Sequence, residues 1–428
     1  MKLTEKNWKR LFVLARVLLG LAFMLSGFVK AVDPWGTAYK IDDYIHAFGW
    51  TFFSGISFLT SIALSAFEFF LGSSLLLGVY KRTVPLLILI FLIFATPLTL
   101  YIAIANPVTD CGCFGDALIL SNTATFLKNV FLLALAVFVY LRSDLAYRLY
   151  GMHTNRWVAF WCLLFPILLS SHSALHLPIF DFRPYKIGNY LPELMTKSEG
   201  AIQDSIQTLF VYEKEGKKQT FTLEEAPLED ANWKFVERKE KVIRTGEVPP
   251  IHDFVLQDPL YGDITQDVLN DTSYVFLMVT PKLEQLNYSN LSAFLATKDY
   301  ATRLGYRFLV LTSSNQKQID DWKFEYDESM DFALVDEVTL KTIIRSNPGL
   351  VLLKKGTVLQ KWGFRDVPQF EDKAMPNTQW GVVREVKPVK RFGGLVLAYL
   401  IPLIVLLMIH QGYRITLPGQ KKDETPNL

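Results

Sequence analysis

Residues 83–106 read TVPLLILIFLIFATPLTLYIAIAN and contain no charged side chain. A helix of about 20 apolar residues crosses the hydrocarbon core of a bilayer, so this stretch predicts a membrane-spanning helix. Hydropathy predicts five further spans, at Leu11–Val32, Ser54–Tyr80, Thr125–Leu141, Trp157–Leu175 and Phe392–Ile409. The sequence therefore predicts an α-helical membrane bundle that is surrounded by a lipid bilayer.

Lysine and arginine residues predict the orientation of these spans. They gather before the first span, between the second and third, between the fourth and fifth, and after the sixth: Lys2, Lys6, Lys9, Arg10, Lys81, Arg82, Arg142, Arg148, Arg156, Arg414, Lys421 and Lys422. If the spans alternate, all these residues lie on one side, which the positive-inside rule makes cytoplasmic. We therefore expect a bacterial inner-membrane protein with cytoplasmic termini and a periplasmic segment from about Leu177 to Arg391.

Two of the three cysteines, Cys111 and Cys113, lie in the stretch DCGCFGD at 110–116, between the third and fourth spans. On the predicted outer side of the membrane disulfides can form. A disulfide closed over one intervening residue is strained and therefore easily reduced, which makes the pair a candidate for catalytic thiol–disulfide exchange. The alternative is a glycine-rich turn that contains two small buried thiols.

Charged side chains inside the spans need partners. Glu68 lies near the middle of the second span, where it is a candidate proton acceptor or contact for a quinone-like ligand. An internal ion pair explains Glu68 equally well. Arg16 and Lys30 are expected to have structural roles, and Lys30 is expected to extend its ammonium toward the membrane surface.

A metal site is a further alternative for the cysteines. His172 and His176 are one helical turn apart near the outer end of the fifth span, so they point in the same direction. Together with Cys111 and Cys113 they could form a Cys2His2 site. The simpler interpretation is that the two histidines are polar anchors at the end of a helix.

The long segment between the fifth and sixth spans divides into two parts. Strands predicted at 208–212, 219–223 and 233–237 form a small β-rich region that ends near Pro249. From Ile251 onward the strands alternate with helices, which predicts an α/β layer. The predicted strands are 273–280, 307–312, 332–335, 350–354 and 358–362, and the predicted helices are 290–304, 316–325 and 339–344.

This second part resembles the thioredoxin-like fold of membrane-anchored thiol oxidoreductases. The resemblance rests on DFVL at 253–256, on the apolar strand Ser273–Thr280 and on PGLVLLKKG at 348–356. It implies a cis peptide bond before Pro348 and a partner-binding surface with Pro348, Thr280 and Pro281. No cysteine follows Cys162, so this domain lacks the family's Cys-x-x-Cys and cannot carry out dithiol chemistry.

The first four spans resemble the DoxX-like membrane proteins, in the subgroup typified by the methylamine-utilisation protein MauE. The resemblance is carried by RVLLG at 16–20, SGFVK at 26–30, Asp33-Pro34, Glu68 with Gly72, and CGCFG at 111–115. It implies a four-helix membrane domain that works in disulfide handling and protein maturation.

These patterns predict six parts of the chain. They are a DoxX/MauE-like membrane domain at 1–150, a fifth membrane helix at 151–178, a linker with the β-rich region at 179–249, a thioredoxin-like domain at 250–375, a linker with the sixth membrane helix at 376–412, and a cytoplasmic tail at 413–428.

The expected function is thiol–disulfide redox chemistry, or maturation of envelope proteins, through Cys111 and Cys113. A membrane quinone or a periplasmic protein would be the other redox partner. The alternative is a non-enzymatic scaffold or assembly factor whose α/β domain binds client proteins, so the sequence leaves enzymatic activity open. The formal net charge is only +2, and no phosphate-cradling, zinc-finger or RNA-binding motif is present, so nucleic acid is not an expected partner.

Overall fold

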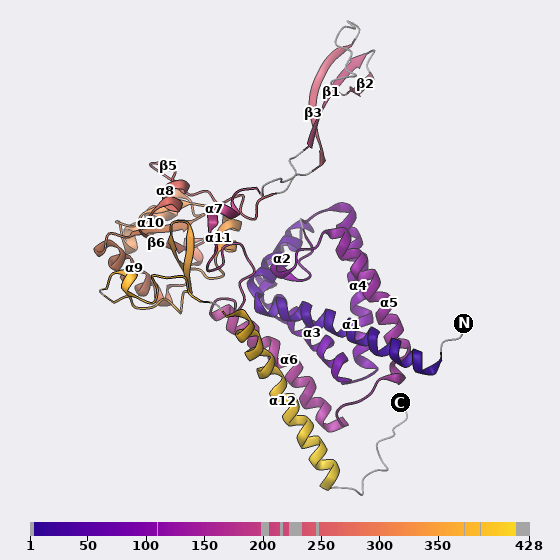
Figure 1. Ribbon diagram of the computed structural model, residues 1–428. Helices are drawn as coiled ribbons and strands as arrows, with labels where there is room; N and C mark the ends of the chain where they lie inside the picture. Colours follow the sequence, from indigo (N-terminus) through magenta and orange to yellow (C-terminus); the bar gives the residue numbers. More distant parts are fainter. Residues whose placement is uncertain are drawn as a thin grey trace.

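The computed structural model describes residues 4–108, 110–197, 205–214, 217–221, 233–244, 248–371, 373–385 and 387–416. Within these residues, six helices are long and apolar enough to cross a membrane, as predicted. They are α1 (Glu5–Val32), α3 (Ser57–Leu77), α4 (Thr83–Ala105), α5 (Asn122–Leu141), α6 (Met152–Leu175) and α12 (Pro388–Thr416). Figure 1 shows the start of α1 and the end of α12 at the side of the bundle away from the α/β domain.

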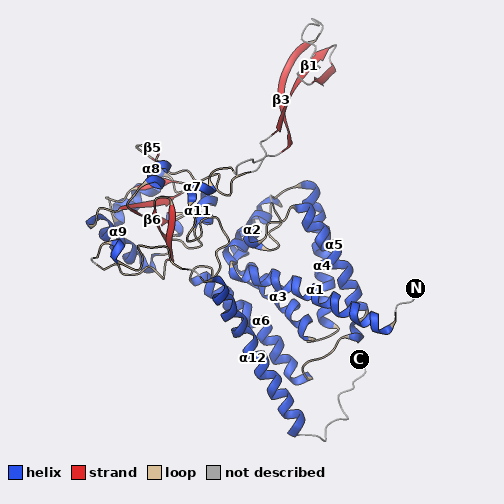
Figure 2. Ribbon diagram, in the orientation of Figure 1, coloured by secondary structure: helices blue, strands red, loops and turns tan. Residues whose placement is uncertain are grey.

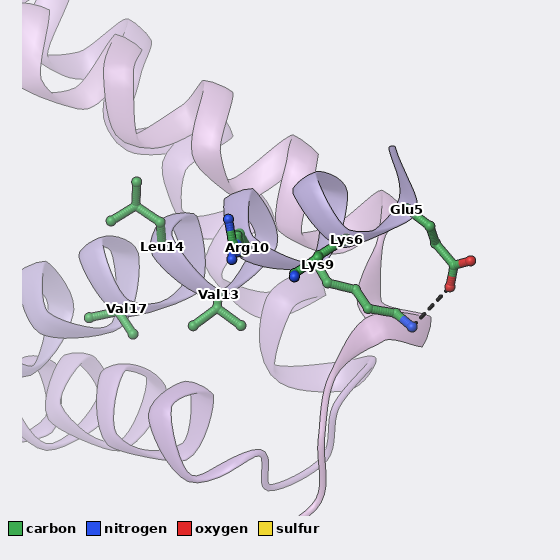
Figure 3. A pocket seen from close by; sticks show the side chains of 7 residues that line it. All are labelled: Glu5, Lys6, Lys9, Arg10, Val13, Leu14 and Val17. Carbon is green, nitrogen blue, oxygen red and sulfur yellow. Dashed lines mark ion pairs between the residues drawn. The ribbon is translucent and has the colours of Figure 1, made fainter. Parts of the chain in front are cut away.

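The first turns of α1 carry the basic residues that sequence analysis placed before the first span. Lys6, Lys9 and Arg10 line a shallow groove there together with the exposed apolar side chains of Val13 and Leu14 (Figure 3). This groove is far along the chain from the cysteines and contains no nucleophile. Basic side chains next to an apolar helix surface are typical of the border between a bilayer and water.

Helices α1 and α3 pack with their backbones unusually close together. A Cβ placed on Gly27 would lie 2.3 Å from the backbone nitrogen of Phe69, and one on Gly72 would lie 2.3 Å from that of Met24. Small residues permit such close approach in membrane bundles. The packing brings the outer half of α1, which carries Lys30, against Glu68 of α3.

A helix that the sequence analysis did not predict, α2 (Pro34–Ala47), follows α1 directly. Pro34 opens this helix, and the side chain of Asp33 accepts a hydrogen bond from the backbone of Gly36. Helix α2 packs against α3 and leads to a short 3-10 segment. The short 3-10 helices lie at Thr51–Ile56, Gly115–Ala117, Ser143–Leu145, Leu283–Gln285, Tyr288–Asn290 and Met375–Asn377.

The predicted α/β layer is a mixed sheet with the strand order β10-β9-β6-β7-β8-β4-β5. Its strands are β4 (Gln257–Asp258), β5 (Gly262–Asp263), β6 (Tyr274–Val279), β7 (Arg307–Thr312), β8 (Phe332–Leu334), β9 (Gly349–Lys354) and β10 (Thr357–Gly363). Strands β6, β7 and β8 are parallel, and the other pairs are antiparallel. Every residue of β6 is buried, because an apolar cluster covers each face of the sheet.

The helices of this domain are α7 (Leu191–Leu194), α8 (Thr265–Asn270), α9 (Leu291–Arg303), α10 (Gln316–Tyr326) and α11 (Glu337–Ile343). The predictions of α9, α10 and α11 are confirmed to within a few residues. The peptide bond between Asn347 and Pro348 is cis, which is the geometry expected for this proline.

The β-rich region is a separate three-stranded antiparallel sheet with the order β2-β1-β3. Its strands are β1 (Ser205–Lys214), β2 (Lys217–Phe221) and β3 (Lys234–Arg244), and Lys214 pairs with Lys217 across the predicted hairpin. The turn residues 215–216 lie outside the described residues. Figure 2 shows the sheet projecting from the rest of the chain as a narrow arm.

Candidate functional site

The two cysteines lie in a short turn, here called the cysteine loop (residues 110–116). Gly112 has a φ of 65°, a left-handed conformation that favours glycine. The backbone N–H of Gly112 donates to Oδ1 of Asp110, and that of Gly115 donates to the Gly112 carbonyl, which closes the turn. The Sγ atoms of Cys111 and Cys113 lie 2.7 Å apart, longer than the bond of about 2.05 Å in a disulfide, so both residues are thiols in direct contact.

A buried ion pair holds the loop against the bundle. Nζ of Lys30 lies 2.7 Å from Oε2 of Glu68 and donates a second hydrogen bond, also 2.7 Å long, to the carbonyl of Cys113. The hydroxyl of Ser26 lies 2.8 Å from the same carboxylate oxygen and 2.7 Å from the same carbonyl, so its single hydrogen can serve either acceptor. The Lys30 and Glu68 side chains are only 6% and 8% exposed.

This arrangement gives Glu68 the ion-pair partner that one of its two interpretations expects, and it corrects the interpretation of Lys30. Glu68 has the cationic partner that a carboxylate inside a membrane requires. The expectation that Lys30 extends toward the membrane surface is wrong, because its ammonium is buried between Glu68 and the cysteine loop. Arg16 has the expected structural role, since it donates to the carbonyls of Leu75 and Leu76 at the end of α3.

The two thiols differ in acidity. A hydrogen bond from Cys111 is the main cause that lowers the pKa of Cys113 to about 6, and the positive charges of Lys128 and Lys30 lower it further against the effect of burial. The same hydrogen bond and burial raise the pKa of Cys111 well above its usual value. The hydrogen bond between them thus favours the thiolate form of Cys113 and the protonated form of Cys111.

The thiols face a cavity of about 190 Å³ between the cysteine loop and four helices of the bundle. The polar residues of its wall are Cys111, Cys113, Ser26, Lys30, Tyr44, Glu68, Thr99, Lys128 and Asn129. The largest group of apolar residues comes from α4: Phe91, Leu92, Ala95, Leu98 and Ile102. Typical ligand pockets measure about 300–1,000 Å³, so this one has room for a single ring rather than for a complete lipid-like molecule.

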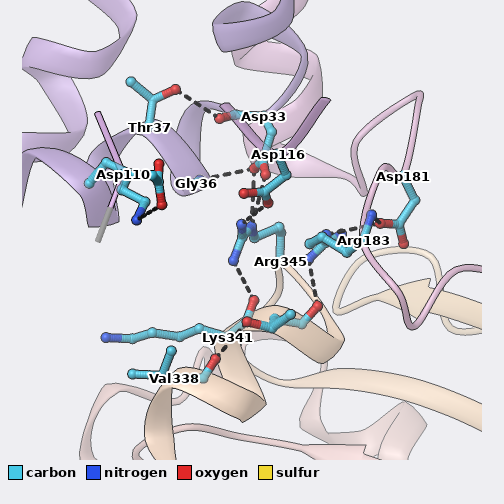
Figure 4. A network of polar contacts seen from close by, with 12 residues as sticks. Asp33, Gly36, Thr37, Asp110, Asp116, Asp181, Arg183, Val338, Lys341 and Arg345 are labelled. Atoms are coloured by element: carbon cyan, nitrogen blue, oxygen red, sulfur yellow. Dashed lines mark hydrogen bonds and ion pairs between the residues drawn. The ribbon is translucent and has the colours of Figure 1, made fainter. Parts of the chain in front are cut away.

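The α/β domain contacts the cysteine loop through one arginine. Arg345, which follows α11, pairs with Asp116 of the loop at 2.8 Å and with Asp33 at 3.0 Å (Figure 4). A third hydrogen bond joins its guanidinium to the carbonyl of Lys341. Burial by itself raises the pKa of Asp33, but the charges of Arg345 and Arg183 outweigh it and keep this pKa below its usual value. The domain is thus fixed beside the cysteines by a buried charge network.

The remaining predicted site residues lie in the α/β domain, in the part that includes the cis bond. Thr280 is buried, and its hydroxyl donates to Oδ1 of Asn347 at 2.7 Å. Pro281 is also buried, and its carbonyl accepts hydrogen bonds from Ser313. None of Thr280, Pro281 and Pro348 lines the cysteine cavity, and their part in partner binding stays a prediction.

The structure does not assemble the alternative Cys2His2 site. His172 and His176 line a different cavity, where Nδ1 of His176 lies 2.7 Å from Oδ1 of Asp366. Over the part of the chain that the structure describes, no group of three or more histidine, cysteine, aspartate or glutamate side chains is placed to hold a metal ion. Cys162 lies in a buried apolar cluster with Val79 and Val158, as expected for a packing residue.

Several residues of the site were not recognised from sequence. Ser26 and Lys30 are four residues apart on α1 and so lie on one face of the helix. This spacing could have indicated that the two side chains belong to the same site. Lys128 is the one charged residue in the predicted fourth span and could have been assigned to the same side as Cys113. Nothing in the sequence around Arg345 indicates a partner more than two hundred positions away.

Comparison with known proteins gives two family matches. Residues 8–142 match the family model described as Methylamine utilisation protein MauE. Residues 206–245, which include most of the projecting arm, match a model described as a domain of unknown function (DUF8463). No curated protein and no solved structure matches the chain.

The MauE match spans α1 to α5 and contains Lys30, Glu68 and both cysteines of the loop. Residues 8–142 are thus similar to MauE-type membrane proteins. The chain joins this part to two further candidate membrane helices and an α/β domain.

Proposed function

We propose that this protein is a membrane thiol–disulfide oxidoreductase in which Cys111 and Cys113 alternate between dithiol and disulfide. The observation that carries the proposal is the contact of the two sulfurs at 2.7 Å in a cavity where Cys113 is acidic. A small movement suffices to form the S–S bond, and the thiolate needed for exchange is already present near neutral pH. In the cell the loop would face the periplasm from a bacterial inner membrane.

The exchange with a client protein proceeds through a mixed disulfide. A client thiolate attacks the Cys111–Cys113 disulfide, forms a bond to one sulfur and releases the other as a thiolate. The second client thiolate then attacks the mixed disulfide. The client leaves with a disulfide and has lost two electrons, and the cysteine loop holds the dithiol that the structure contains.

A membrane quinone is the proposed oxidant that restores the disulfide. The cavity fits one ring beside the thiols, and its apolar wall from α4 suits an isoprenoid quinone. Two electrons pass from the dithiol to the quinone, and two protons make it a quinol. The S–S bond forms as the sulfurs lose these electrons. Glu68 lies on the cavity wall and is the proposed proton carrier at this step.

The α/β domain is proposed to be a thioredoxin-like platform that positions clients rather than a second redox centre. Its mixed sheet, which has an apolar cluster on each face, supports this assignment. The contact between Arg345 and Asp116 places the domain next to the cysteines.

The competing proposal is a non-enzymatic scaffold. It is favoured by the lack of cysteines after Cys162 and by the buried charge network that ties the α/β domain to the membrane part. In that case the α/β domain and the arm bind envelope proteins, and the cysteine loop is a structural turn.

Quinone reduction separates the two proposals. The full-length protein in detergent, with Cys162→Ser to leave one thiol pair, is reduced, freed of reductant and mixed with a short-chain benzoquinone. If the protein is an oxidoreductase, each protein molecule should reduce one quinone, measured as loss of the quinone absorbance, and should form one disulfide. The variant with Ser at both 111 and 113 is the control. Equal quinone consumption by the control would exclude the loop as the electron source.

A further inference from the structure

A second cavity lies where the α/β domain meets the ends of α6 and α12, and it shares no residue with the cysteine cavity. Its volume is about 1350 Å³. Its walls include His172 and His176 from the end of α6, residues 360–363 from β10, and Arg391 and Gly394 from the start of α12. Figure 1 shows these ends of α6 and α12 beside the α/β domain. Because both helices are candidate membrane spans, a cavity at their ends is expected at the border between bilayer and water.

Each acidic side chain that lines this cavity has a nitrogen-bearing partner. Asp181 pairs with Lys361 at 2.6 Å, and Asp366 pairs with His176 at 2.7 Å. Glu385 has Lys387 as its partner at 3.3 Å.

Two arginines in the same wall have no acidic partner among the described residues. Arg391 donates one hydrogen bond to the neutral carbonyl of Ile179, which leaves further N–H donors of its guanidinium. Neither Arg391 nor Arg384 forms an ion pair with any residue that the structure describes. Lys186 adds a third cation to the wall. The cavity is therefore suited to an anion, and arginine forks bind phosphate oxygens in pairs.

The cavity also has apolar lining residues. Phe180, Phe182, Trp362 and Leu395 contribute to its wall. A Cβ placed on Gly394 would have no heavy atom within 4 Å, so the space beside this glycine is open. Only 6% of the most apolar window of α12 is buried, which leaves this helix largely to the bilayer.

We propose that this cavity binds the phosphate-bearing headgroup of a phospholipid from the leaflet on the side of the α/β domain. The phosphate accepts hydrogen bonds from Arg391 and Arg384, and the acyl chains descend past Gly394 and Leu395 between α12 and α6. A lipid is proposed rather than a soluble phosphate because the same cavity has apolar lining residues and is bordered by α12, a candidate membrane span whose apolar window is only 6% buried.

Two adjacent glycines provide a matched test. Gly393 and Gly394 both have open space around a hypothetical Cβ, so leucine is tolerated at either position, but only Gly394 lines the cavity. The full-length protein in detergent is titrated with phosphatidylglycerol, and bound lipid is counted by native mass spectrometry. Gly394→Leu is expected to weaken binding about tenfold and Gly393→Leu by less than about twofold. Equal affinity in the two variants would overturn the proposal.

A second pair of variants tests the charge. Arg391→Gln keeps a donor for the Ile179 carbonyl but removes the cation, and Lys390→Gln removes the neighbouring charge, which is not part of the cavity wall. Only Arg391→Gln is expected to weaken phosphatidylglycerol binding, by about fivefold or more. Inorganic phosphate should not displace the lipid at millimolar concentration. Displacement would assign the cavity to a soluble anion and overturn the lipid proposal.

Discussion

The ammonium of Lys30 lies 2.7 Å from the carboxylate of Glu68, and both side chains are almost completely buried between α1, α3 and the cysteine loop. The same ammonium donates to the carbonyl of Cys113. The pair thus stabilises the bundle and, through one hydrogen bond, fixes the position of the proposed nucleophile.

Replacing one member of this ion pair should lower the stability of the protein much more than replacing both. Glu68→Gln leaves the Lys30 charge buried without a counter-charge, which typically costs about 3–5 kcal/mol. The double variant Lys30→Met with Glu68→Leu replaces the pair with apolar groups of similar size and should melt closer to the parent protein. Thermal unfolding in detergent measures the difference. Single variants as stable as the double variant would show that the charges do not interact.

The acidity of Cys113 predicts a specific pH profile. A thiol with a pKa of about 6 is a thiolate above that pH and loses its nucleophilicity as the pH falls through it. Iodoacetamide labelling of Cys113, measured in a Cys162→Ser background, should therefore reach half its maximal rate near pH 6.

The identity of residue 111 should control this profile, because hydrogen bonding from Cys111 is the largest cause of the shift. Cys111→Ser keeps a donor and should preserve a low midpoint. Cys111→Ala removes it and should move the midpoint upward, which slows labelling at pH 6 about fivefold for the first pKa unit gained and about tenfold for each further unit. Identical midpoints in the two variants would show that the hydrogen bond does not set the acidity.

Arg345 should control how firmly the cysteine loop is held. Arg345→Gln removes the ion pairs with Asp116 and Asp33, so hydrogen exchange of residues 110–116 should accelerate by about tenfold or more. Arg365→Gln is the matched control, because Arg365 is an exposed arginine of the same domain. Unchanged exchange in Arg345→Gln would mean that the α/β domain does not restrain the loop.

The close packing of α1 and α3 should not tolerate a methyl group. In Gly72→Ala the new Cβ would lie 2.3 Å from the backbone nitrogen of Met24, so the helices must separate, at a typical cost of about 1–3 kcal/mol. Gly55→Ala, where no atom lies within 4 Å, is the control in the same thermal measurement. Similar melting temperatures for the two variants would contradict the close packing of α1 and α3.

Most of the architecture could be predicted from the sequence because the patterns that indicate each helix and strand lie within short stretches of the chain. Apolar runs such as 83–106 predict spans by length and composition, and the apolar β6 strand predicts a sheet covered on both faces. Helix α2 was missed because its apolar face is short and its start, Asp33-Pro34, was assigned to the family resemblance rather than to a helix cap.

The site was less predictable because its contacts are not local. Cys111 and Cys113 could be selected from their spacing, but the hydrogen-bond donors to the Cys113 carbonyl, Ser26 and Lys30, come from α1. The arginine that holds the loop comes from the α/β domain. Sequence spacing alone could not show that Lys30 turns inward, since a lysine near the end of a span more often reaches the membrane surface.

The most direct test of the redox proposal is the state of Cys111 and Cys113 in growing cells. Thiols are trapped with acid in a Cys162→Ser background and labelled with a mass-tagged maleimide before and after reduction. Redox cycling predicts a mixture of dithiol and disulfide that shifts toward dithiol when quinone is depleted. A pair that is fully reduced and freely labelled under every condition would contradict the mechanism and favour the scaffold.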